Sequence, residues 1–218
     1  MYFESRSESG IILASLLVEK YRYEDCAVMA INEGGVLVGE PIATTLHSVL
    51  TLLVTEDIAV PGENVSFGAV SQDGGFVYNS DFSSGELDAY TSEFHSYLEE
   101  EKRKSFQKIN RLIGDGGTID KELLRNRTVI IVSDSFDSVS PLAVAVEFLK
   151  SIKINRLIMV APIATLNVID YMHVAADELH TLDVKTNYLG VDHYFEDNEL
   201  PSREEAITRI NQIILNWR

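Results

Sequence analysis

Residues 133–140 of this chain read Ser-Asp-Ser-Phe-Asp-Ser-Val-Ser and gather hydroxyls and carboxylates that could hold a polar ligand. They follow the apolar stretch 128–132 and precede an apolar, helix-length stretch that ends at Lys150. A buried strand delivers such a loop to the carboxyl edge of a sheet. There, the next helix points its free N–H groups and positive dipole end at a bound anion. The loop is therefore a predicted ligand site centred on Asp134.

A second turn, residues 32–35, follows the apolar strand predicted at 26–31 and contains two adjacent glycines. The five histidines show no metal-ligand spacing, so no metal site is predicted. The candidate ligand-binding residues of the loop are Ser133, Asp134, Ser135, Phe136, Asp137, Ser138, Val139 and Ser140, and none is assigned a catalytic role.

The order of these segments resembles the phosphoribosyltransferases of the type I fold, in particular a bacterial branch with a Pro-Arg-Gly-Gly turn. Residues 30–36 are similar to that turn, 54–62 to the branch's Arg-Lys-Ile-Gly-Ala-Pro-Gly segment, and 133–139 to the donor loop of two acids followed by Thr-Gly. Residues 160–164, 176–178 and 190–195 continue this resemblance to the family, in the same order along the chain. The resemblance covers about the whole chain, and it adds Asn32, Glu33, Gly34 and Gly35 to the candidate ligand-binding residues.

The resemblance implies transfer of a phosphoribosyl group from phosphoribosyl pyrophosphate to a nitrogenous acceptor, with magnesium, in nucleotide metabolism. The donor site departs from the family pattern. Glu33 stands in place of the turn's Arg, Ser133 in place of the first acid and Val139 in place of the loop's Gly. Replacing a cation by an anion costs about 4 kcal/mol, from a lost charge-assisted contact plus repulsion, and this is close to three decades of affinity.

We therefore predict a phosphoribosyltransferase-like protein with a degenerate donor site, weak or inactive in transfer, that binds a ligand or a protein partner. One alternative is an active phosphoribosyltransferase, a glycosyltransferase that uses magnesium. A second alternative is a non-catalytic subunit that pairs with an active homologue. The expected ligand is small and anionic or nucleotide-like, no cofactor is assigned apart from magnesium in the active alternative, and association of the chain with itself is left open.

The charge balance disfavours two classes of partner. The chain has 18 basic and 34 acidic residues, a net charge of −16, which opposes binding to nucleic acids and to anionic membranes. The single cysteine, Cys26, lies in an apolar strand and cannot form an internal disulfide, which favours a reducing compartment. Without a signal-peptide pattern or a long apolar run, we expect a cytoplasmic protein.

Apolar stretches of strand and helix length alternate along the chain, which predicts an α/β fold with an open, mostly parallel twisted sheet and helices on both faces. An antiparallel hairpin edge is predicted around the turn at 72–74, and a long, partly exposed helix within 84–127 as a helical cover. Residues 1–218 are predicted to form a single domain. A strand is predicted at 49–55.

Two further expectations concern polar groups near the predicted site. Ser140 before Pro141 is a good helix N-cap, which gives the hydroxyls of the loop a purely structural alternative role. Glu33, Asp134 and Asp137 should lie at one edge of the sheet, with Glu56 and Asp57 at the end of a neighbouring strand, so that their like charges form an electronegative cluster.

Overall fold

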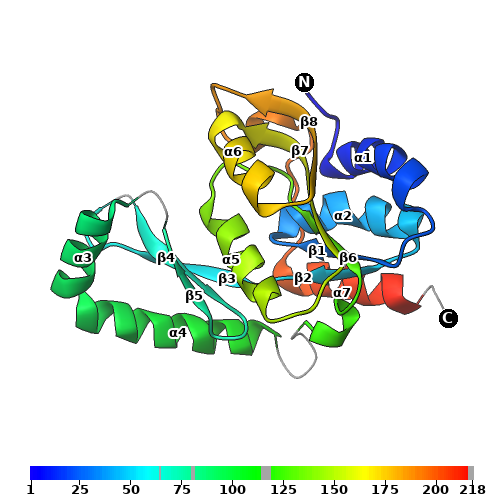
Figure 1. The fold of residues 1–218 in the computed structure, drawn as a ribbon. Helices are drawn as coiled ribbons and strands as arrows, with labels where there is room; N and C mark the ends of the chain where they lie inside the picture. The colour runs from blue at the N-terminus through cyan, green and yellow to red at the C-terminus, as the bar shows by residue number, and fades with distance from the viewer. Residues whose placement is uncertain (64, 80–81, 114–118, 216–218) are drawn as a thin grey trace. The chain divides into compact units, whose positions relative to one another are not determined.

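The computed structural model describes residues 1–63, 65–79, 82–113 and 119–215. The chain packs into two compact units (Figure 1). Unit 1 contains Met1–Leu53, Ile119–Ser138 and Ile152–Arg218, and unit 2 contains Val54–Thr118 and Val139–Ser151. The assignments of 1–218 as one domain and of 84–127 as a cover stay predictions, and part of the predicted cover, residues 114–118, lies outside the described residues.

Unit 1 is built on a five-stranded parallel sheet in the order β2-β1-β6-β7-β8. The strands are β1 (Cys26–Ala30), β2 (Val49–Leu52), β6 (Thr128–Val132), β7 (Arg156–Thr165) and β8 (Glu178–Lys185). Every residue of β1 and β6 is buried, as expected for apolar strands in a parallel sheet covered on both faces. The prediction of a central parallel strand at 128–132 is confirmed.

Helices lie on both faces of this sheet. They are α1 (Arg6–Tyr21), α2 (Glu33–Leu46), α6 (Leu166–Ala175) and α7 (Arg203–Leu215), with the short 3₁₀ turns η2 (Lys121–Leu123) and η3 (Val191–Tyr194). From the centre of the sheet, β1-α2-β2 proceeds toward one edge and β7-α6-β8 toward the other, so right-handed crossovers place α2 and α6 on opposite faces. Figure 1 shows α1 and α6 on either side of β7 and β8. The predicted α/β class is confirmed.

Unit 2 contains a separate antiparallel sheet, β3 (Thr55–Ala59), β4 (Ser66–Ser71) and β5 (Phe76–Tyr78), with helices α3 (Ser84–Glu93), α4 (His95–Ile113) and α5 (Ser140–Lys150). The predicted hairpin is confirmed as β4 and β5, where the N–H of Gly74 donates to the carbonyl of Ser71 at 2.9 Å. The hairpin is part of this three-stranded sheet and is not an edge of the parallel sheet. Helices α4 and α5 both contact β4, whose residues after Ser66 are all buried.

Two local predictions were wrong. The strand predicted at 49–55 is two strands, because the chain leaves the parallel sheet after Leu52 and pairs with β4 from Thr55 onward. The long helix predicted within 84–127 is confirmed as α4, and the shorter helix α3, which ends at Phe94, precedes it. The residue that precedes the first turn of α5 is Val139 and not Ser140, and no side chain caps this helix; the Ser140 hydroxyl bonds Asn79 instead, at 3.3 Å.

We expect limited proteolysis to cut first within residues 84–113. Helix α3 has no buried residue, so little packing opposes its local opening, whereas β6 and most of β7 are buried. Mass spectrometry of the first fragments would locate the cut. First cleavage inside residues 129–161 would contradict this expectation.

None of the helices in the described part of the chain combines the length and the apolar character needed to cross a bilayer.

Candidate functional site

The direction of the chain's crossovers reverses between β1 and β6. After β1 the chain goes through α2 to β2 on one side, and after β6 it goes to β7 on the other side. Ligands of open α/β sheets bind outside the carboxyl ends of the strands at such a point. The residues that follow these two strands are Ile31–Asn32 and Ser133–Asp134, so the topology of unit 1 brings the two predicted segments together.

The carboxylate of Asp134 is fully engaged by groups of the chain itself. Its Oδ1 accepts a hydrogen bond from Asn32 Nδ2 at 2.9 Å, and its Oδ2 accepts one from Arg6 Nε at 2.7 Å. Asp134 is only 3% exposed and Arg6 only 1%. The Asp134 side chain has almost no exposure to solvent, so groups of the chain itself occupy the central residue of the predicted site.

Arg6 also binds groups from the C-terminal part of unit 1. Its Nη2 donates to Asp192 Oδ1 at 2.8 Å, and its Nη1 reaches the carbonyl of Asp197 at 3.4 Å and Asn198 Oδ1 at 3.3 Å. The guanidinium carbon lies 4.7 Å from the centre of the Phe195 ring. Arg6 thus joins the start of α1, the end of β6 and the segment after η3, and its planar fork suits this geometry.

Sequence reasoning missed Arg6, although one signal was present. Arg6 is the first residue of α1, whose N-cap is Ser5. A cation there opposes the positive end of the helix dipole, so an arginine at this position points to an anionic partner elsewhere. No local pattern identifies that partner as Asp134, which is 128 residues away in sequence.

The glycine turn makes room for this carboxylate. A Cβ atom added to Gly34 would lie 2.1 Å from Asp134 Oδ2, far inside contact distance. Asn32 is the N-cap of α2, and its Oδ1 accepts the N–H of Gly35 at 2.6 Å. The turn therefore positions the side chain of Asn32, which donates to Asp134. The carboxylate of Asp134 occupies the space that a side chain at residue 34 would fill.

The expected cluster of uncompensated acidic charges is wrong for Glu33 and Asp134. Arg203 Nε donates to Glu33 Oε1 at 2.6 Å, and Arg6 neutralises Asp134. Both arginines lie far from their partners in sequence, and only the tertiary fold brings them together. Partial burial and the nearby Asp134 carboxylate raise the pKa of Asp137.

The remaining residues of the predicted loop lie in different surroundings. The hydroxyl of Ser135 lies 3.0 Å from that of Tyr188, whose pKa is raised by burial. Phe136 is a buried core residue whose N–H donates to the carbonyl of Ile163 at 2.9 Å. Ser138 is exposed. Val139 and Ser140 belong to unit 2. Ligand binding by the twelve candidate residues stays a prediction.

The whole chain is similar to one solved structure of nearly equal length. The protein TT1426 from Thermus thermophilus superposes with a TM-score of 0.72 at 21% sequence identity, covering 100% of this chain and 99% of that one. The two proteins share a fold. The sequence matches no protein-family model.

Two further neighbours superpose with lower scores. A purine phosphoribosyltransferase from Pyrococcus horikoshii gives a TM-score of 0.49 at 12% identity, covering 92% of this chain and 96% of that one. A hypothetical protein from Neisseria gonorrhoeae with bound ppGpp gives a TM-score of 0.45 at 11% identity, covering 89% and 94% of the two chains.

Proposed function

We propose that this chain is a phosphoribosyltransferase-like protein whose donor site is degenerate. It transfers phosphoribosyl groups weakly or not at all, and it acts as a ligand- or protein-binding module. The observation that carries the proposal is the pairing of Asp134. By its resemblance to the family, Asp134 is the one acid of the donor loop's pair that this chain keeps, and it would hold the ribose hydroxyls of the donor. Here its two carboxylate oxygens accept hydrogen bonds from Arg6 and Asn32.

The cost of opening this site supports the proposal. A ribose that bound Asp134 would have to displace Arg6, and breaking a buried ion pair costs about 3–5 kcal/mol. This cost alone lowers the affinity by between two and four decades. Glu33, which stands in place of the pyrophosphate-binding Arg, further opposes a multiply anionic donor.

Magnesium enters only with the alternative of an active enzyme. The residues around Asp134 do not fit this ion, because Mg²⁺ takes oxygen ligands and both oxygens of this carboxylate accept from donors of the chain. Among the described residues, no group of three or more His, Cys, Asp and Glu side chains is arranged to hold a metal. The second alternative, a non-catalytic subunit, would share the degenerate site and differ by binding an active homologue.

Calorimetric titration of the chain with phosphoribosyl pyrophosphate, with and without magnesium, tests the proposal. We expect weak or undetectable heat, with a dissociation constant above about 1 mM, equivalent to less than about 4.1 kcal/mol of binding free energy. The conservative variant Asp134→Asn serves as the control, because a donor that does not contact Asp134 binds the variant and the wild type equally. Micromolar binding that Asp134→Asn abolishes would refute the degenerate site and support the active enzyme.

A further inference from the structure

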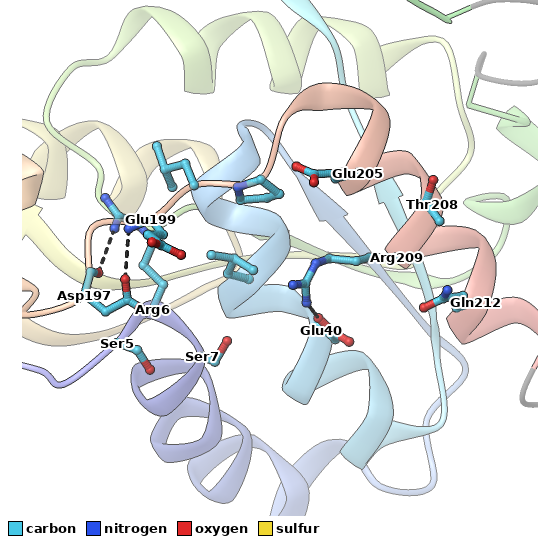
Figure 2. A pocket seen from close by; sticks show the side chains of 13 residues that line it. Ser5, Arg6, Ser7, Glu40, Asp197, Glu199, Glu205, Thr208, Arg209 and Gln212 are labelled. Atoms are coloured by element: carbon cyan, nitrogen blue, oxygen red, sulfur yellow. Dashed lines mark hydrogen bonds and ion pairs between the residues drawn. The ribbon is translucent and has the colours of Figure 1, made fainter.

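Unit 1 contains a cavity of about 650 Å³ that the predicted donor site does not explain (Figure 2). The start of α1, helix α2, residues 197–201 and one face of α7 line it. The lining residues of α7 are Glu205, Thr208, Arg209 and Gln212, a spacing that places them on one side of the helix. A volume of this size is typical of sites for small molecules.

Acidic side chains outnumber basic ones in the lining of the cavity. Arg209 pairs with Glu40 at 3.2 Å, and the guanidinium of Arg6 is held by Asp134 and Asp192. Within the part of the chain that the structure describes, no ion pair joins Asp197, Glu199 or Glu205 to a cation. The cavity therefore has three carboxylates without an ion-paired cation, and both of its arginines are already paired with acids.

Two helix N-termini adjoin the cavity, and a capping serine already binds one backbone N–H of each helix. At α1, Glu8 accepts the N–H of Glu4 at 2.7 Å and donates its own to Ser5 Oγ at 3.1 Å. At α7, Glu205 likewise accepts from Ser202 N at 2.8 Å and donates to Ser202 Oγ at 3.3 Å. The three carboxylates without an ion-paired cation oppose an anion at these N-termini by like-charge repulsion. The cavity therefore disfavours anions.

Apolar side chains separate the carboxylates. Leu200 and Pro201 lie in sequence between Glu199 and the start of α7, and Leu37 lies one turn before Glu40 on α2; all three line the cavity. Figure 2 shows Asp197 and Glu199 beside Arg6 at one end and Glu205 on α7 at the other. The lining thus carries carboxylates at both ends and apolar surface between them, and its two cations, Arg6 and Arg209, are each paired with acids.

We propose that this cavity binds a linear aliphatic polyamine. Its ammonium groups would meet the carboxylates at the two ends, and its methylene chain would lie on Leu37, Leu200 and Pro201. The hydroxyl of Thr208 and the amide of Gln212 offer further acceptors. The net charge of −16 adds a long-range field that attracts such a cation. Polyamine binding goes beyond the proposed function, and its test uses no phosphoribosyl donor.

Titration calorimetry of the full chain with spermidine at low salt tests this site. We expect one molecule bound per chain and at least a tenfold weaker affinity for the double variant Glu199→Gln, Glu205→Gln. Glutamine at 205 keeps the capping bonds of α7 because its amide oxygen can accept from Ser202. The matched control is Asp88→Asn with Glu93→Gln on α3, which removes two exposed charges from unit 2 and should change the affinity less than twofold.

A second variant tests the shape of the cavity without changing charge. Thr208 is exposed on α7, so Thr208→Trp should fold normally and obstruct the cavity, weakening spermidine binding at least tenfold. The absence of saturable binding, several molecules bound per chain, or an equal loss of affinity in the control variant would each overturn the proposal. The last two results would indicate diffuse counterion attraction instead of a site.

Discussion

The variant Arg6→Ala is expected to lower the free energy of unfolding by about 3–5 kcal/mol, because it leaves the carboxylate of Asp134 buried without its cation. Asp134 is 3% exposed, so solvent cannot replace the missing guanidinium without opening the structure. Urea denaturation followed by circular dichroism would measure this change as a lower midpoint with an unchanged slope.

Two variants show whether the effect comes from the buried pair. Arg22→Ala removes an exposed guanidinium just after α1, which lies over the Tyr23 ring at the surface, and should cost no more than about 1 kcal/mol. The double variant Arg6→Met, Asp134→Asn removes both charges and keeps an acceptor for Asn32, so it should recover part of the loss. A cost below about 1 kcal/mol for Arg6→Ala would show that the pair does not hold unit 1 together.

The variant Gly10→Ala is expected to destabilise the chain by about 1–3 kcal/mol through overpacking between α1 and α2. A Cβ atom at Gly10 would lie 2.4 Å from the carbonyl oxygen of Val38 and 2.6 Å from Pro41 Cγ. Since the first of these contacts is with backbone, a side-chain rotation cannot relieve it, and α1 must move. Thermal unfolding of the purified variant would measure the loss.

A second glycine provides the matched control. Gly85 lies in α3, and a Cβ atom there would meet nothing within 4 Å. Gly85→Ala should therefore stabilise the chain by about 0.4–1 kcal/mol, since alanine reduces the entropy of the unfolded state. If both variants shifted stability in the same direction, the close approach of α1 to α2 at Gly10 would not explain the result.

Much of the fold can be predicted from the sequence because the signals for strands, helices and turns are local. The apolar run 128–132 and the alternation of strand and helix lengths predicted a buried parallel sheet, and the turn at 72–74 predicted the hairpin. The prediction of a single strand over 49–55 was the main error, because the chain passes there from the parallel sheet to the antiparallel one. An apolar run cannot show where a chain leaves one sheet and enters another, since both sheets favour the same residues.

The sequence by itself determined the α/β class, the edge of the sheet at which Asn32 and Asp134 meet, and the acidic character of the chain. Only the tertiary structure decided how the acidic side chains at that edge are paired. It brought Arg6 to Asp134 and Arg203 to Glu33, across 128 and 170 residues of sequence. Periodicity and turn residues describe neighbours along the chain, whereas the neutralisation of a buried charge depends on which distant element packs against it.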